Sequence, residues 1–405
     1  MKILFKYIFA LSLFCQIGYV NARQPYQATV TVNTATVTVS DPNLVDLTHD
    51  LRSEAINKFL PFYTPVSPVS IDINLRGVFA LTSFAANSTT LVVVIPQTGV
   101  TQTFTGGTRD ESLLLFKDFV RDAGVHHELL PAYAKYSPID PIAGNPNSLM
   151  AQMAQADYLV GHLSPLSGCD CSWGAQPIVH QVQSGLDAGR AFSGGYDTTI
   201  VTLPLRYSFS PDLEWAFIID APISYIRNGG ASSLITSVGF GVRVPITYDW
   251  SITSVMRGGA GGSLDLCTSG CFLTTGLTSV YNYKIYDFVL SMTNYGGYFT
   301  STNLWLTGIN FNYHLHNWIF KNGLALTSCE GLTFCNRPLN LSLSFVDSYF
   351  TGHQLYMTHY DEVGVTLITN YVNPCIEYDS LSLGFVYQFG QQGYNGYYVN
   401  CVYQF

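Results

Sequence analysis

The most constraining feature of this sequence is its last nine residues, YYVNCVYQF, from Tyr397 to Phe405. The odd positions are apolar or aromatic, whereas the even positions include Asn400 and Gln404. This period of two is typical of a strand whose two faces meet different surroundings. An apolar strand at the edge of a soluble sheet promotes aggregation, but a strand that closes a membrane barrel has both edges paired. The ending therefore favours a barrel over a soluble sheet.

This ending resembles the terminal strand of Gram-negative outer-membrane β-barrel proteins, in which a final aromatic residue is the assembly signal. The resemblance implies that Tyr403 and Phe405 direct the chain to the barrel-assembly machinery. It also implies that the partner of the folded barrel is outer-membrane lipid, so that the location is the bacterial cell outer membrane. It leaves the activity open.

The N-terminus is consistent with export. Lys2 and Lys6 form a positive region, residues 7–17 are mostly apolar, and Val20-Asn21-Ala22 fits the small-residue rule for cleavage. We therefore expect residues 1–22 to be a signal peptide that is removed from the mature protein.

Alternating segments follow one another from about Asp197 to the C-terminus. Clear examples are Thr199–Phe209, Leu339–Phe345 and Leu381–Phe389, in which apolar side chains occupy every second position. Such segments have roughly the ten-residue length that a tilted strand needs to cross a bilayer. The low charge content, 11% of residues, and the 27 tyrosines agree with strands that face lipid on one side. The sequence therefore predicts an all-β transmembrane antiparallel barrel over residues 196–405.

The predicted number of strands is about 12, because bacterial barrels of this kind have an even number. Fourteen strands are the alternative, with Ile71–Ala85 as an upstream strand. We expect short periplasmic turns to alternate with longer external loops. The predicted turns are 210–212, 248–249 and 314–317, and the predicted loops are 227–233, 258–271, 295–300 and 328–338.

Residues 23–195 predict a mixed α/β region before the barrel. Residues 27–40 alternate Thr and Val, which indicates extended structure. A capping box at Thr108–Glu111 predicts a helix over 111–123, and Ser148 predicts the N-cap of a second helix over 149–160. A third amphipathic stretch, residues 178–191, leads into the barrel. The pattern fits a plug in the lumen, a periplasmic domain or a surface-exposed passenger.

Charged residues in the polar register of the predicted strands are candidate lumen residues. On the lipid face at mid-depth an Arg costs about 2–4 kcal/mol, so such side chains are expected to face inward. There they either line a water-filled pore or neutralise one another in a closed barrel. The four residues are Arg206, Glu214, Asp220 and Arg243.

Close cysteine pairs predict loop disulfides, because an exported protein meets an oxidising environment. The pairs are Cys267 with Cys271 and Cys329 with Cys335. The pairing of the other exported cysteines (Cys169, Cys171, Cys375, Cys401) is left open. The paired CxxC spacing of zinc sites is not found, so we expect neither a metal nor another cofactor.

The sequence contains no strong catalytic motif, and we assign no catalytic residue. The local pattern that is most similar to the Asp and His groups of omptin-like proteases is His359 with Asp361 and Glu362. The net charge of −9 argues against nucleic acid as a partner. The leading interpretation is a porin-like channel or transport protein for small solutes, without enzymatic activity. The alternatives are an autotransporter-like surface protein or adhesin, with residues 23–175 displayed and 178–191 as a lumen helix, and an omptin- or lipase-like enzyme.

Overall fold

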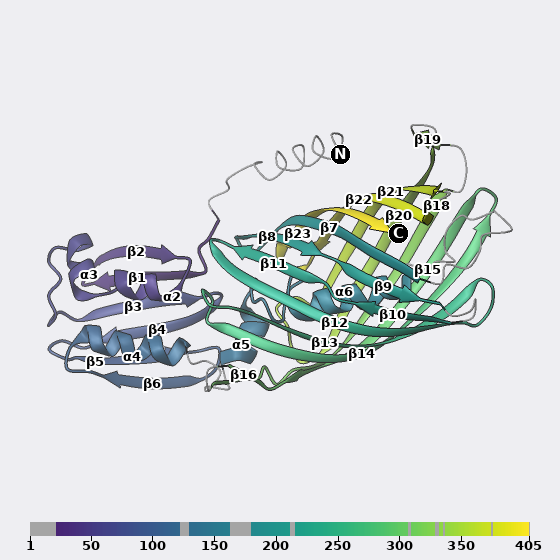
Figure 1. Ribbon diagram of the computed structural model, residues 1–405. Helices are drawn as coiled ribbons and strands as arrows, with labels where there is room; N and C mark the ends of the chain where they lie inside the picture. Colours follow the sequence, from purple (N-terminus) through teal and green to yellow (C-terminus); the bar gives the residue numbers. More distant parts are fainter. Residues whose placement is uncertain are drawn as a thin grey trace.

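The computed structural model describes residues 22–121, 129–162, 180–210, 215–306, 309–328, 332–334, 337–373 and 376–404. A small sheet with helices lies at one end of a large barrel (Figure 1). Several residues of the sequence predictions lie outside the described part: residues 1–21, Glu214, Cys329, Cys335 and Phe405.

The N-terminal domain, residues 22–121, is a six-stranded antiparallel sheet with strand order β2-β1-β3-β4-β5-β6. The Thr–Val alternation of residues 27–40 forms the hairpin β1–β2, and its inward side chains, such as Val30, are buried. Helices pack on one face of the sheet. The elements are β1 (Tyr26–Val32), β2 (Ala35–Asp41), α2 (Leu44–Asp50), α3 (Ser53–Phe59), β3 (Val69–Leu75), β4 (Val78–Phe84), β5 (Thr90–Ile95), β6 (Val100–Thr105) and α4 (Arg109–Arg121).

Both predicted helices are confirmed. The first is α4, and the amide of Glu111 donates to Thr108 Oγ1 at 3.2 Å, as a capping box requires. The second is α6 (Leu149–His162), which follows a shorter helix, α5 (Leu129–Tyr136). Among the described residues, none of the helices is both long and apolar enough to cross a membrane.

The barrel is closed and antiparallel, with 12 strand positions, as the sequence predicts. β7 closes it, because β7 pairs with β23 on one side and with β8 and β9 on the other. The continuous strands are β7 (His180–Ser193), β12 (Ala231–Pro245), β13 (Trp250–Ser263), β14 (Thr268–Ile285), β15 (Phe288–Thr302), β18 (His316–Ser328), β20 (Arg337–Gly352), β21 (His359–Asn373), β22 (Ile376–Gly390) and β23 (Asn395–Gln404). Short extra elements are β16 (Leu304–Leu306), β17 (Ile309–Phe311), β19 (Leu332–Phe334) and the 3-10 turn η1 (Gln391–Gly393).

Prolines interrupt the remaining two strand positions. Pro204 separates β8 (Tyr196–Leu203) from β9 (Leu205–Phe209), and Pro222 lies between β10 (Ala216–Asp220) and β11 (Ile223–Asn228). Proline has no amide hydrogen for the ladder, so a regular strand stops there. Both halves of each interrupted strand still pair with the same neighbouring strand.

The barrel has an apolar outside and a polar inside. Outward side chains include Leu234, Phe240 and Met256, which are 56%, 61% and 67% exposed. Inward side chains include Thr253 and Thr278, which are fully buried. This inversion of the usual soluble pattern is typical of a barrel surrounded by lipid.

The barrel begins earlier than the predicted residue 196. Residues 180–193 form strand β7, so the expectation of a helix over 178–191 is wrong. The segment is a strand that pairs on both edges, with β23 on one side and β8 on the other. The proposal that Ile71–Ala85 supplies a barrel strand is also wrong, because β3 and β4 belong to the N-terminal sheet.

The predicted alternation of short turns and long loops is wrong. Residues 295–300 lie inside β15, and β11–β12 turn tightly at Gly229 and Gly230. The strand directions place Ser328, at the end of β18, and Arg337, at the start of β20, at the end of the barrel where β23 finishes, and turn 314–317 at the opposite end. Loop length therefore does not distinguish the two ends.

The predicted disulfide between Cys267 and Cys271 does not form in the structure. Cys267 lies in the β13–β14 turn with φ 50°, and its thiol contacts the carbonyl oxygen of Leu264 at 3.6 Å. Cys271 lies within β14, opposite Ala260. Cys267 therefore belongs to the turn, whereas Cys271 is held in place by its pairing with β13, and no disulfide joins the two residues.

Candidate functional site in the barrel lumen

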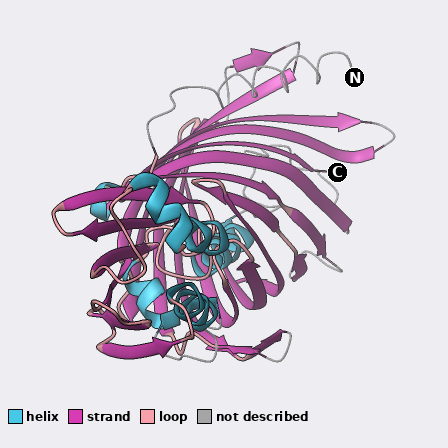
Figure 2. Cartoon of the chain, turned by 90° about the vertical axis from the view of Figure 1, so that its left-hand side faces the viewer, coloured by secondary structure: helices cyan, strands magenta, loops and turns pink. Residues whose placement is uncertain are grey.

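Residues 129–162 form a plug in the mouth and interior of the barrel. The plug consists of α5, the buried loop 137–148 and α6. Helix α6 packs against β10, β12, β13, β14 and β15, and it lies among the barrel strands in Figure 1. Figure 2 views the molecule from the side that carries the N-terminal domain, with the barrel strands behind it. Its sequence is mostly apolar and small, with Ala151, Ala154 and Ala156 buried, so that the helix fits inside the ring of strands.

Glycines leave the space that α6 occupies. A methyl group added at Gly323 on β18 would overlap the hydroxyl of Tyr158, and one at Gly259 on β13 would meet Met153. Gly161 on the helix likewise lies against Thr278. The wall and the helix are therefore closely fitted.

A chain of alternating charges connects the plug to the wall. Asp157 of α6 accepts from Arg257 Nε at 2.6 Å, and Arg257 Nη2 donates to Asp220 at 2.7 Å. Asp220 also accepts from Arg206 Nε at 3.1 Å. All four side chains are largely buried. Because two positive and two negative charges alternate, the group is neutral, which makes its burial tolerable.

Polar contacts surround this chain. The second carboxylate oxygen of Asp157 accepts from Thr274 and Tyr295, each at 3.3 Å. Arg206 donates to Gln183, and Arg257 donates to Ser237 at 3.0 Å. The buried charges therefore have partners on both sides.

A second buried ion pair lies farther around the wall. Lys321 Nζ donates to Glu362 at 2.8 Å and to the hydroxyl of Tyr360 at 3.3 Å. Its ammonium group also lies 5.7 Å from the ring centre of Tyr158 on α6. Near the end of the helix, the ring Nδ1 of His162 lies 2.9 Å from Thr293. The plug is thus held along most of α6.

A third polar group joins the N-terminal domain to the plug. Arg76, in the β3–β4 turn, lies 3.5 Å from Asp140 in the loop 137–148, and both are fully buried. The guanidinium lies 3.8 Å above the ring of Tyr133. Asp140 accepts from the amides of Ile142 and Ala143.

Tyr313, from the segment before β18, completes this joint. Its hydroxyl donates to the Asp140 carboxylate at 2.9 and 3.1 Å. Burial raises the pKa of Tyr313 well above its usual value, so the hydroxyl stays protonated, and remains a donor, even in alkaline solution. The domain, the plug and the barrel rim therefore meet at one carboxylate.

The structure brings Arg206 and Asp220 into direct contact, with side chains inside the barrel. It also places Arg243 inside, where Nη2 donates to the carbonyl oxygen of Val160 on α6 at 3.4 Å. These residues neutralise or contact other groups rather than lining an open pore. Tyr403 lies outward on β23, opposite Leu381.

The residues of the protease-like pattern are divided between two faces. Glu362 points inward to Lys321, whereas His359 and Asp361 share the register of the outward Val363. His316 lies on the barrel rim, with its ring 5.7 Å from that of His353.

Sequence reasoning did not identify Asp157, Arg257 or Lys321 as site residues. A signal was present, because Asp157 is the one acidic residue in the helix LMAQMAQADYLVGH. Its partner Arg257 is 100 residues away in the chain, so the pairing itself could not be inferred from local pattern.

A tight glycine contact gives a direct test of the plug. Gly323→Ala is expected to cost about 1–3 kcal/mol, because its methyl group overlaps the Tyr158 hydroxyl. The measurement is urea unfolding of the refolded protein in detergent. Adding Tyr158→Phe should recover most of the loss.

Gly296→Ala is the matched control, because the nearest side-chain atoms would lie at an ordinary 3.5 Å. Equal stability of Gly323→Ala and Gly296→Ala would contradict the placement of Tyr158 against β18.

No known family model and no curated protein matches this sequence. The structure is similar to the beta domain of the Bordetella autotransporter BrkA, with a TM-score of 0.44 and 10% identity over 56% of this chain and 99% of that one. It is also similar to the translocator domain of autotransporter NalP from Neisseria meningitidis, with a TM-score of 0.44 and 13% identity over 63% and 97%. An outer membrane channel from Pseudomonas putida F1 matches with a TM-score of 0.41 and 8% identity over 58% and 97%. Similarity of this size assigns no specific family.

Proposed function

We propose that this protein is an outer-membrane barrel that carries the N-terminal domain on the cell surface and keeps its lumen closed by the plug. The observation that carries the proposal is the direction of the chain. The domain packs on the β7–β8 turn, where the amide of Arg23 donates to Gly195, and near the β11–β12 turn at Gly229. The N-terminus of β7 and the C-terminus of β23 lie at the other end of the barrel.

Helix α6 links these two ends through the interior. It begins beside the domain-side loop 137–148 and ends at His162, deeper in the barrel, where His162 contacts Thr293 of β15. In an outer-membrane barrel the end with the C-terminus faces the periplasm. The domain then faces outward, with a displayed part of residues 23–121 rather than 23–175.

Epitope accessibility on intact cells tests this orientation. A tag in the β1–β2 turn at Asn33 should bind antibody without permeabilisation, because this turn belongs to the displayed domain. A tag in the β14–β15 turn at Tyr286 should bind only after permeabilisation, because it lies at the opposite end. The reverse result would place the domain in the periplasm and would exclude surface display.

A gated channel is the second candidate. It is favoured by a mainly apolar crevice between α6 and the wall, whose polar lining residues include Gln152, Gln155, Asp187, Thr202 and Arg206. Solute passage along this crevice requires displacement of α6, so the unmodified protein should conduct weakly. A porin-like function and surface display are compatible in one chain, and the plug is the element that decides between a closed and an open lumen.

A further inference from the structure

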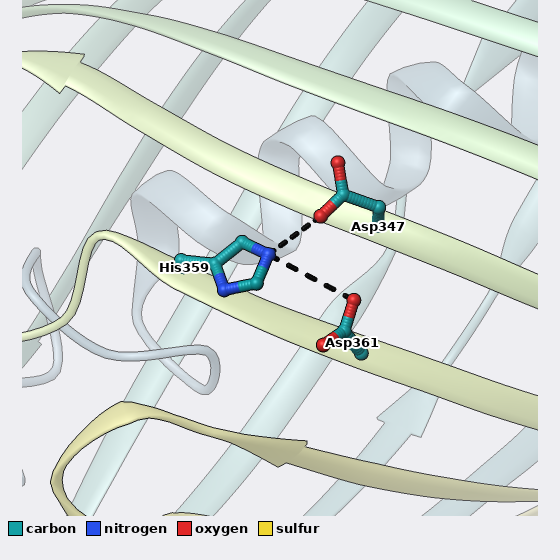
Figure 3. Close-up of side chains that lie close together, drawn as sticks. All are labelled: Asp347, His359 and Asp361. Atoms are coloured by element: carbon teal, nitrogen blue, oxygen red, sulfur yellow. Dashed lines mark hydrogen bonds and ion pairs between the residues drawn. The ribbon is translucent and has the colours of Figure 1, made fainter.

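The outer face of the barrel carries a cluster of metal-ligand side chains. Asp347 lies on β20, and His359 and Asp361 lie on β21. His359 Nε2 is 2.6 Å from Asp347 Oδ1 and 3.8 Å from Asp361 Oδ1. One ligand atom from each residue lies within 4.8 Å of the others, and the three side chains point toward one another (Figure 3).

The cluster belongs to the outside of the wall and not to the lumen. Along β20, Asp347 alternates with the buried Val346 and Ser348 and shares its face with Phe345 and Tyr349, which are 43% and 49% exposed. Asp347 and Asp361 are direct cross-strand partners. The carboxylates therefore interrupt an otherwise apolar surface.

The position along the strands is near the domain-side rim. His359 is the first residue of β21, and the outward aromatic residues Trp318, Phe320 and Tyr349 surround this level of the wall. Aromatic side chains of this kind mark the boundary between lipid and water. The cluster is therefore accessible to ions from the aqueous side.

The charges of the cluster favour a divalent cation as its ligand. Two carboxylates directly opposite each other repel. A protonated His359 would leave one negative charge uncompensated beside an apolar surface. A divalent cation with a neutral imidazole compensates both carboxylates and uses all three side chains as ligands.

The distances suit a tetrahedral transition metal. With metal–nitrogen and metal–oxygen bonds of about 2.0–2.2 Å, ligand atoms at a tetrahedral metal are separated by about 3.3–3.6 Å. The two separations, 2.6 and 3.8 Å, bracket this range, so small side-chain rotations suffice. Imidazole nitrogen with carboxylate oxygen is a donor set that zinc accepts. We propose that Asp347, His359 and Asp361 form a zinc-type divalent metal site on the outer face of the barrel, with water in the remaining coordination position.

Metal titration of the refolded full chain in detergent tests this site. After treatment with a chelator, the protein should bind one equivalent of Zn²⁺ by calorimetry, and Co²⁺ should produce visible absorption bands. His359→Ala should weaken Zn²⁺ binding at least tenfold and abolish the Co²⁺ bands. Asp347→Asn combined with Asp361→Asn should do the same while preserving side-chain size.

His316→Ala is the matched control, because His316 is also exposed on this rim but lies outside the cluster. It should retain full Zn²⁺ affinity. Each variant must first show the heat-modifiable gel mobility of a folded barrel. Absence of Zn²⁺ binding by the unmodified protein, or equal affinity of folded His359→Ala, would overturn the proposal. Neither outcome affects the proposed display of the domain, which depends on other residues.

Discussion

Replacing Asp157 with alanine is expected to release α6 from the barrel wall and to raise ion conductance. The change leaves Arg257 buried without its partner on the plug, and Thr274 and Tyr295 lose their acceptor. Breaking a buried ion pair on one side costs about 3–5 kcal/mol. Since each 1.4 kcal/mol is tenfold in an equilibrium, the plug-displaced population should rise by roughly two to three and a half powers of ten. Planar-bilayer recordings measure the effect as more frequent and longer openings.

The matched control removes both charges. In Asp157→Leu with Arg257→Met, Asp220 still pairs with Arg206, so no buried charge is left without a partner. Well-packed apolar replacements of buried ion pairs are often neutral or stabilising. This double variant should therefore conduct as little as the unmodified protein. If Asp157→Ala alone has unchanged conductance and unfolding, the charge chain does not hold the plug.

Replacing Asp140 with alanine is expected to loosen the N-terminal domain from the barrel, at a cost of about 3–5 kcal/mol. The substitution removes the acceptor for Tyr313 and for two backbone amides, and it leaves the Arg76 charge buried. Nε and Nη2 of Arg76 have no hydrogen-bond partner among the described residues, so Asp140 is its main compensation. Limited proteolysis of the refolded protein should show faster cleavage between the domain and the barrel.

Two further variants make this result specific. Arg76→Met should be less damaging than Asp140→Ala, because Asp140 keeps three other donors when the guanidinium is removed. Asp72→Ala, on the exposed side of β3, should leave proteolysis unchanged. If Arg76→Met is the more damaging of the two, the carboxylate is not the centre of the joint.

The barrel could be predicted because its signal is local. A strand with lipid on one side alternates visibly, as in Leu381–Phe389, and each segment can be recognised without its neighbours. Strand β7 was misassigned because it contains Gly185, Asp187 and Gly189 and has a weak apolar face. The pairing of β7 with β23, more than 200 residues later, determines its conformation, and no local pattern contains that information.

The site in the lumen likewise depends on long-range contacts that no local sequence pattern predicts. The helix predicted over 149–160 follows from its cap and composition, but its place in the lumen depends on partners supplied by several strands. Arg206 and Asp220 could be assigned to the interior from register alone. That Arg257 joins Asp220 to Asp157 required the closed barrel, because the three residues come from three distant elements.

The two proline interruptions give the barrel wall unequal stiffness. Where Pro204 and Pro222 break adjacent strand positions, fewer ladder hydrogen bonds resist shear than between β13 and β14. Thermal deformation of the wall should therefore concentrate at the two interrupted strand positions, β8–β9 and β10–β11. Asp220 is the last residue of β10, next to the interruption at Pro222, and Arg257 lies on the continuous strand β13. Their ion pair therefore connects the interrupted strands to the continuous part of the wall. Asp157 of the plug pairs with the same Arg257. Withdrawal of α6 from the lumen therefore also disturbs the ion pair that supports the interrupted strands.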